Sequence, residues 1–143
     1  MKIDIVHVRD HIPDEYRDYL DGQRAIRIID ENSEIRGELV WKLASRWKCT
    51  FEIKEFGIFQ DSDRRRGWGT ILLQAAIDDM KRYIKCVDPR YKAWRIYLFC
   101  EERNAIARKF YEVRGFQKEA MLKDFYGSDD NAILYSLCLK DHS

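Results

Sequence analysis

The segment from Arg64 to Thr70 has the residue types and spacing best suited to bind an anion. It reads Arg-Arg-Arg-Gly-Trp-Gly-Thr and lies between an apolar extended run, residues 51–59, and a helical run, residues 71–83. The first turn of a helix offers free N–H groups and the positive end of the helix dipole. Gly67 and Gly69 have no side chain that would keep an anion from the backbone. The segment therefore predicts a site for a phosphorylated ligand; the alternative is a helix start that needs two small residues for packing.

Two common phosphate-binding loops do not fit this segment. A P-loop requires a Lys followed by Ser or Thr directly after its last glycine. Here Thr70 follows Gly69 with no Lys between them. A dinucleotide-binding turn requires a third glycine, and Leu72 stands at that position. The ligand must therefore be sought in the surrounding elements.

The elements that would position this turn follow from hydrophobic periodicity and turn residues. Pro13 and Gly22 flank a short helix candidate, Pro89 breaks the chain, and Gly115 is suited to cap a helix C-terminus. The predicted strands are residues 2–8, 25–30, 36–44, 47–59, 94–100, 116–122 and 132–139, and the predicted helices are 14–20, 68–84 and 104–113. This order indicates an α+β fold with a mostly antiparallel sheet and one parallel crossover.

Composition and charge exclude several classes of protein. A chain of 143 residues suits one domain, residues 1–143. A net charge of +1 gives no basic field for nucleic acid. The absence of a long apolar run and of a signal peptide predicts no membrane partner. Four scattered cysteines without a Cys-x-x-Cys pair predict no metal site and a reducing, cytoplasmic compartment. A monomer and a homodimer both stay open.

A second group of residues gives the Arg/Gly turn a context. Asn104-x-x-Ala107 is followed by Phe110-Tyr111 and Gly115-Phe116, downstream of Arg64-x-x-Gly67-x-Gly69. Both motifs, in this order and on these elements, resemble the GCN5-related N-acetyltransferase (GNAT) superfamily, from about residue 51 to 139. The resemblance implies a GNAT fold, whose central mixed sheet is splayed between the fourth and fifth strands and flanked by helices.

The resemblance also implies acetyl-CoA as co-substrate and names the residues that would bind it. Backbone N–H groups of residues 65–70 would hold the diphosphate, and the strand edge at residues 58–60 would pair with the pantetheine arm. Asn104 matches the cofactor-contacting Asn of the family and also suits a helix N-cap, and the two roles are compatible. Phe110 and Phe116 are interpreted as core. The expected cofactor-binding residues are Ile58, Phe59, Gln60, Arg64, Arg65, Arg66, Gly67, Trp68, Gly69, Thr70, Asn104 and Tyr111. The three arginines either touch phosphates or form a solvated basic turn.

The reaction implied is attack of a neutral amine on the thioester. Tyr111 matches the family tyrosine that protonates the leaving thiolate. A lysine amine, with a pKa of about 10.4, needs a base, whereas an α-amine, with a pKa of about 8, needs less help. Strand alternation predicts that Glu52 and Glu55 point to opposite faces. Glu55 lies at a position used for the base in several family members and is the favoured candidate; the alternative is a solvated strand acid. Phe99 replaces the base found in relatives of ribosomal-protein acetyltransferases.

The sequence leaves the acceptor amine open. The segment from residue 122 to 132 resembles the closing hairpin of enzymes that act on protein amines, although turn chemistry explains its residues equally well. A short segment between the first two strands suggests an open groove, suited to a protein or peptide amine. The alternatives are a small-molecule amine acetyltransferase, an acyl-CoA-binding regulatory module without transferase activity, and an interaction domain without a cofactor.

Overall fold

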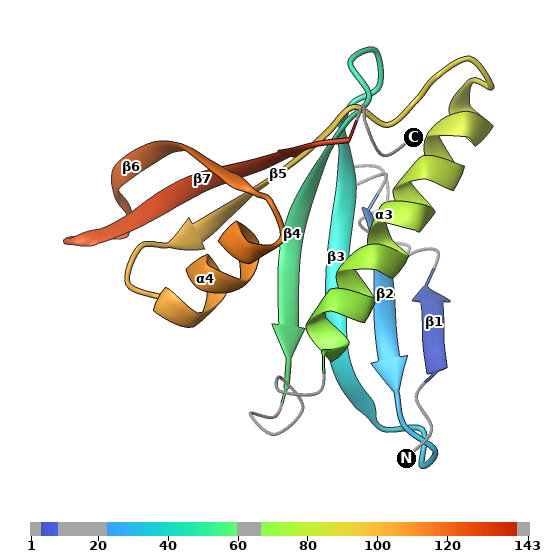
Figure 1. Cartoon of the computed structure of the whole chain (residues 1–143), viewed down its shortest axis with the longest axis horizontal. Helices are drawn as coiled ribbons and strands as arrows, with labels where there is room; N and C mark the ends of the chain where they lie inside the picture. The colour runs from blue at the N-terminus through green and yellow to red at the C-terminus, as the bar shows by residue number, and fades with distance from the viewer. Residues whose placement is uncertain (1–3, 9–22, 60–66, 140–143) are drawn as a thin grey trace, which may run out of the picture.

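The computed structural model describes residues 4–8, 23–59 and 67–139. Within them seven strands form one sheet in the order β1-β2-β3-β4-β5-β7-β6 (Figure 1). The strands are β1 (Asp4–Val8), β2 (Gln23–Ile29), β3 (Ile35–Ser45), β4 (Thr50–Ile58), β5 (Arg95–Glu101), β6 (Gln117–Gly127) and β7 (Asp130–Cys138); the helices are α3 (Trp68–Val87) and α4 (Ala105–Val113). The predicted helix at 14–20 lies outside the described residues. Neither α3 nor α4 is long and apolar enough to cross a membrane.

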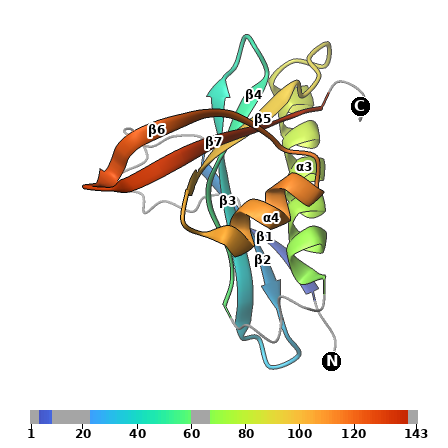
Figure 2. The same cartoon turned by 60° about the vertical axis from the view of Figure 1, so that its left-hand side comes forward.

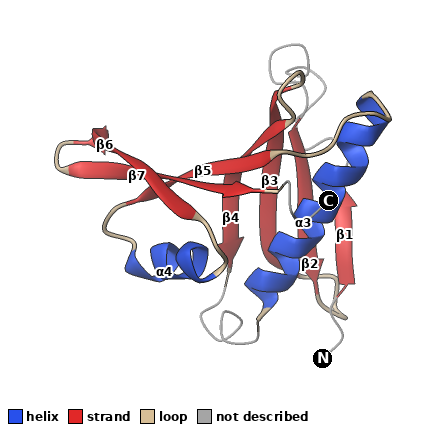
Figure 3. Cartoon of the chain, turned by 45° about the horizontal axis from the view of Figure 1, so that its top comes forward, coloured by secondary structure: helices blue, strands red, loops and turns tan. Residues whose placement is uncertain are grey.

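The sheet divides between β4 and β5. These two strands are parallel and pair only at Thr50–Arg95, Phe51–Ile96 and Glu52–Tyr97. Every other described pair of neighbouring strands is antiparallel. Beyond the third pair the strands diverge, and β5, β7 and β6 run away from β4 as a wing (Figures 1 and 3). The predicted α+β class and the splay between the fourth and fifth strands are confirmed.

Helix α3 packs on strands β2, β3 and β4 (Figure 1). Leu72, Ala76 and Met80 recur at helical spacing and are fully buried, as the sequence pattern predicts. The helix continues to Val87, three residues beyond the predicted end. Asp88 then adopts an extended backbone with φ −156° and ψ 122°. It precedes Pro89, and a residue before proline is disfavoured in the helical region.

A buried carboxylate joins α3 to the sheet. Asp79 accepts hydrogen bonds from Arg24 Nε at 3.0 Å, Arg24 Nη2 at 2.9 Å and Trp41 Nε1 at 3.1 Å. The Trp41 ring in turn meets Phe51 and Tyr83 edge-on, each at 5.4 Å. A charge taken out of water is tolerated only when it is paired and hydrogen-bonded, and Asp79 meets both conditions. The network fixes α3 over β2 and β3.

Helix α4 lies beside α3 on the same side of the sheet (Figure 2). The Asn104 side chain accepts a hydrogen bond from Ala107 N at 3.1 Å, so it is the N-cap that its residue type predicts. At the other end Gly115 has φ +94° and its N–H donates to Glu112 O, while Phe116 N donates to Tyr111 O. These two bonds form a Schellman motif, which requires a residue in the left-handed region. The predicted glycine cap is confirmed.

Polar contacts fix α4 on β7. Tyr135 is fully buried, and its hydroxyl donates to Glu112 Oε2 at 2.6 Å and accepts from Arg108 Nε at 3.3 Å. Arg108 Nη1 also donates to the Glu102 carbonyl at 3.0 Å. Burial, followed by the Glu112 contact, raises the pKa of Tyr135. The neutral phenol therefore bridges the Glu112 carboxylate and the Arg108 guanidinium, and these contacts hold α4 in one position on the wing.

Candidate active site

Beyond Glu52, the splay leaves one edge of β4 without a strand partner among the described residues. Phe59 N donates to Arg36 O of β3 at 2.9 Å, and Ile58 lies opposite Gly37. In an antiparallel pair, hydrogen-bonded and non-hydrogen-bonded residue pairs alternate. The backbone N–H and C=O of Ile58 therefore point away from β3, toward the gap, as do those of Phe56 two residues earlier. An extended chain carrying amide groups could bind to this edge.

Two cavities occupy the gap. The helix-side cavity has a volume of about 260 Å³ and the hairpin-side cavity about 250 Å³. The helix-side cavity is lined by Phe56, Gly57, Ile58, Gly69, Asn104, Ile106, Ala107, Phe110 and Tyr111. The hairpin-side cavity is lined by Ile53, Lys54, Glu55, Phe56, Leu98, Phe99, Cys100, Glu101, Asn104, Ala107, Tyr111 and Tyr126. Four residues, Phe56, Asn104, Ala107 and Tyr111, line both, so the two spaces meet there.

Tyr111 lies at this meeting point. Its ring is packed edge-on against Phe56 at 6.1 Å, Phe110 at 5.5 Å and Phe116 at 5.5 Å. Burial, with a smaller contribution from the Cys100 thiol, raises the pKa of Tyr111 far above its usual range. The hydroxyl therefore stays protonated at neutral and mildly alkaline pH. A protonated hydroxyl on a residue that lines both cavities is suited to donate a hydrogen bond to a group that gains negative charge.

Glu52 and Glu55 share one face of β4, and the prediction that they point to opposite faces is wrong. Trp41 lies opposite Ile53 and the preceding Val40 lies opposite Glu55, so Lys54 has no partner of its own. This is a β-bulge, and its extra residue reverses the alternation beyond it. A bulge depends on the pairing of two strands, so alternation along one strand could not reveal it.

The two acids nevertheless have different surroundings. Glu55 is exposed and lines the hairpin-side cavity. The Glu52 side chain is 13% exposed, lies 3.6 Å from Lys54 Nζ, and accepts a hydrogen bond from the Tyr97 hydroxyl at 3.4 Å. Burial, with the charge of Glu52, raises the pKa of Tyr97. Glu55 therefore remains the better placed candidate for a base.

The N-terminus of α3 combines three features that favour an anion. Gly67 is the N-cap, with φ +75° and no side-chain capping bond, and the first turn carries no acid. Ile71 N donates to Gly67 O at 3.2 Å, so the N–H groups of Gly69 and Thr70 precede the first intrahelical bond. Arg114 Nε donates to Thr70 Oγ1 at 2.8 Å and brings a guanidinium to this end of the helix.

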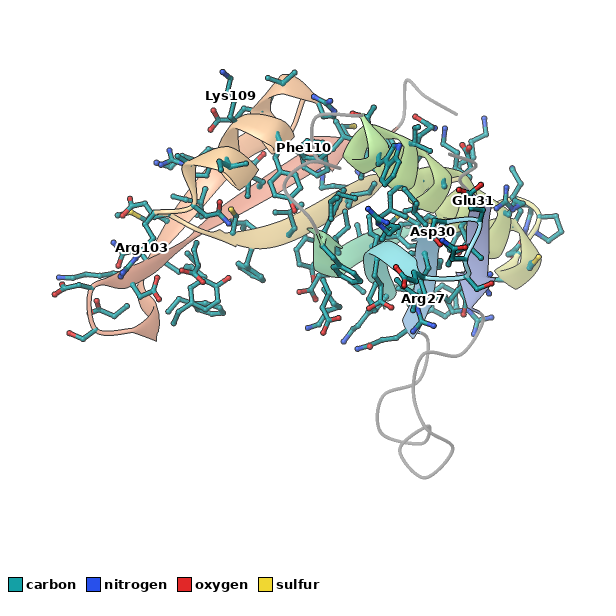
Figure 4. All side chains as sticks on the ribbon, turned by 90° about the horizontal axis from the view of Figure 1, so that it is seen from below. Arg27, Asp30, Glu31, Arg103, Lys109 and Phe110 are labelled. Atoms are coloured by element: carbon teal, nitrogen blue, oxygen red, sulfur yellow. The ribbon has the colours of Figure 1, made fainter. Side chains whose placement is uncertain are left out.

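Gly69 is explained in part by packing. A Cβ at this position would lie 3.1 Å from Cε2 and 3.3 Å from Cζ of Phe110. Figure 4 shows Phe110 directed inward from α4 while the neighbouring Lys109 points outward. At Gly69 packing therefore requires a small residue, which was the alternative explanation from the sequence. Gly67 instead allows a positive φ. Trp68 is buried, with the Arg36 guanidinium 5.9 Å from its ring centre, so only its backbone could contact a ligand.

Several predicted site residues gather at the gap. Ile58, Gly69, Asn104 and Tyr111 line the helix-side cavity, and Glu55 lines the hairpin-side cavity. Phe116 is core as predicted, while Phe110 both packs on the core and lines the helix-side cavity. Gln60, Arg64, Arg65 and Arg66 lie outside the described residues.

Sequence reasoning missed Phe56 and Arg114. Phe56 lines both cavities, and Arg114 bonds to Thr70 across 44 positions of the chain. The position of Phe56, next to the glycine of an apolar strand, was an available signal. No local pattern pairs an arginine after one helix with a threonine at the start of another.

The splayed sheet, its open strand edge and the two cavities in the gap are the features expected of a GNAT acetyltransferase. A family model for the acetyltransferase (GNAT) family matches residues 8–116, and the chain belongs to this family. None of the curated proteins compared with the chain matches it.

Solved structures share the fold at low sequence identity. The ribosomal-protein-S18-alanine N-acetyltransferase of Escherichia coli has a TM-score of 0.71 at 14% identity, over 96% of this chain and 94% of that one. A GNAT acetyltransferase from Elizabethkingia anophelis with acetyl-CoA bound has a TM-score of 0.71 at 18% identity, over 96% and 98%. The spermidine N-acetyltransferase of Vibrio cholerae, in complex with CoA and spermine, has a TM-score of 0.68 at 16% identity, over 87% and 70%.

Proposed function

We propose that the protein transfers an acetyl group from acetyl-CoA to a primary amine of a protein or peptide, by direct attack of the amine on the thioester. The observation that carries this proposal is that Tyr111, whose raised pKa keeps it protonated, lines both cavities. One cavity suits a donor and the other an acceptor. Acetyl-CoA, when bound, supplies the electrophilic thioester carbonyl.

The donor side fits the parts of coenzyme A. The Ile58 edge of β4 offers backbone groups to the amides of the pantetheine arm, as an added strand would. The N-terminal turn of α3, with Arg114 beside it, offers N–H groups and positive charge to the diphosphate. Asn104 lines the helix-side cavity and can contact the arm while it caps α4.

The chemistry divides between Tyr111 and Glu55. The amine nitrogen bonds to the carbonyl carbon, the C–S bond breaks, and the sulfur leaves as a thiolate. Tyr111 donates a hydrogen bond to that sulfur and stabilises its charge until the thiolate takes up a proton, from this hydroxyl or from water, and leaves as the CoA thiol. Glu55, on the hairpin-side cavity, accepts the proton that the amine loses, either directly or through water.

The test is release of CoA thiol on mixing the protein with acetyl-CoA and a panel of peptides with free N-termini or lysines. We expect acetyl-peptide and CoA in equal amounts, and a raised melting temperature with acetyl-CoA alone. A raised melting temperature without thiol release for any amine would instead support an acyl-CoA-binding module. No effect of acetyl-CoA on either measurement would overturn the proposal.

A further inference from the structure

Aromatic side chains from β5 and from the β6–β7 hairpin form an aromatic wall at the hairpin-side cavity, which Phe99 and Tyr126 line directly and on which Phe125 packs. Phe125 of β6 is stacked on Phe99 of β5, with ring centres 5.3 Å apart and planes at 21°. Tyr126 meets Phe125 edge-on at 5.0 Å. Phe99 and Tyr126 line the cavity, while Phe125 and Tyr126 are 51% and 44% exposed. An exposed aromatic surface of this kind beside a cavity indicates a binding surface for an apolar group.

The same cavity is also lined by acidic side chains. Glu55 of β4 and Glu101 of β5 both line it. The cation among the lining residues, Lys54, has its ammonium 3.6 Å from the carboxylate of Glu52. Burial and the charges of Cys100, Glu101 and Asp130 raise the pKa of Tyr126, so this phenol stays neutral. The cavity therefore complements a cation that has a bulky apolar group next to it.

The edge of β5 gives the cavity a third property. Pairing of β5 with β4 ends at Tyr97, so residues 98–101 have no strand partner on that side within the described chain. An unpaired strand edge can accept the backbone of an extended peptide. A polyamine has no backbone amide groups that could use such an edge.

We propose that the acceptor is the N-terminal α-amine of a peptide whose first side chain is aromatic or large and aliphatic. This rests on the proposed acetyl transfer and names its substrate class. The ammonium group is held by Glu55 and Glu101, and the first side chain lies against Phe99 and Phe125. The peptide backbone runs along the free edge of β5. An α-amine suits an exposed base, because its pKa of about 8 leaves roughly a tenth of it neutral at pH 7.

The experiment compares kcat/KM for peptides that differ only in their first residue, with Phe, Leu, Ser or Gly at that position. Phenethylamine and spermidine serve as non-peptide amines. We expect the Phe and Leu peptides to exceed the Gly peptide by about tenfold, and both non-peptide amines to react more slowly than the Phe peptide. Phe125→Ala should lower the Phe-to-Gly ratio by about three- to tenfold, and Phe125→Leu by less. Trp47→Ala, which removes an 80% exposed aromatic in the β3–β4 turn, should leave the ratio unchanged.

Each of the other possible results would overturn one defined part of the proposal. Equal rates for all four peptides would refute the apolar first residue and leave the acetyl transfer standing. Phenethylamine or spermidine reacting faster than every peptide would refute a peptide acceptor. An equal fall of the ratio in Phe125→Ala and Trp47→Ala would refute the role of the aromatic wall. Absence of thiol release with every amine would overturn the transfer reaction itself, and this inference with it.

Discussion

Tyr111→Phe tests the centre of the proposed site with the smallest possible change. The substitution removes one hydroxyl and keeps the ring, whose contacts with Phe56, Phe110 and Phe116 lie at 5.5 to 6.1 Å. No described residue hydrogen-bonds to this hydroxyl, so its loss should change the free energy of unfolding by less than about 1 kcal/mol. The melting temperature should then shift by no more than about 4 °C.

The expected loss of activity is much larger. A hydrogen bond to a charged group contributes about 1.5–3 kcal/mol, and the sulfur is charged only as the C–S bond breaks. At about 1.4 kcal/mol for each factor of ten, kcat should fall by roughly 10- to 150-fold. The KM for acetyl-CoA should stay within about twofold, because the interaction is absent from the ground state.

The assay is continuous detection of CoA thiol at saturating acetyl-CoA and peptide, from pH 7 to 9.5. Burial raises the pKa of Tyr111, so the hydroxyl stays protonated over this range and the fold-loss should be constant. Tyr126→Phe is the matched control, because Tyr126 lines the same hairpin-side cavity. An unchanged kcat in Tyr111→Phe, or an equal loss in Tyr126→Phe, would refute the role of Tyr111.

Four further results are expected. Glu55→Gln should lower kcat/KM about 10²-fold at pH 7, with recovery as pH rises and the amine loses its own proton; Glu52→Gln is the matched control, and equal losses would contradict the assignment. Asp79→Ala should lower the free energy of unfolding in urea by about 3–5 kcal/mol, because the half-buried arginine and the buried tryptophan that bond to it lose their acceptor; a loss below about 1 kcal/mol would argue against this. Gly69→Ala should raise the KM for acetyl-CoA several-fold by displacing the ring that its Cβ would meet at 3.1 Å, while a gain in helix propensity of about 1 kcal/mol preserves stability; an unchanged KM would count against it. Above pH 10 the unfolded chain should lose the Tyr111 proton first, because the folded pKa is raised, so stability should fall by up to about 1.4 kcal/mol per pH unit; the phenylalanine variant should lose less, and parallel curves would disprove the linkage.

Local sequence patterns predicted most of the fold. Helical spacing of Leu72, Ala76 and Met80 identified the buried face of α3, and Asn104 and Gly115 marked both ends of α4. Strand limits moved by a few residues; the fourth strand begins at Thr50 rather than at residue 47. Each of these features depends on residues that are close to one another in the sequence, so sequence patterns can reveal it.

The features that the sequence did not reveal all depend on pairs of distant residues. The bulge at Lys54 exists because β4 is paired with β3, and it places Glu52 and Glu55 on one face. The contact between Gly69 and Phe110 requires α3 and α4 to lie side by side. The Arg114–Thr70 bond requires the same arrangement. The motifs therefore pointed to residues that line the gap, such as Ile58, Asn104 and Tyr111, whereas the geometry around them depends on tertiary packing.

The short pairing between β4 and β5 also bears on how the protein folds and opens. Residues 95–138 form β5, α4, β6 and β7 as one continuous stretch with its own antiparallel pairs. Within the described residues, the backbone pairing of this stretch with β4 is limited to three parallel pairs, beside side-chain contacts such as those of Phe56 with Phe110 and Tyr111. Such segments commonly open as separate cooperative units in amide hydrogen exchange. A ligand that spans the gap would hold the two units together. Binding of such a ligand would therefore slow amide hydrogen exchange in both units at once.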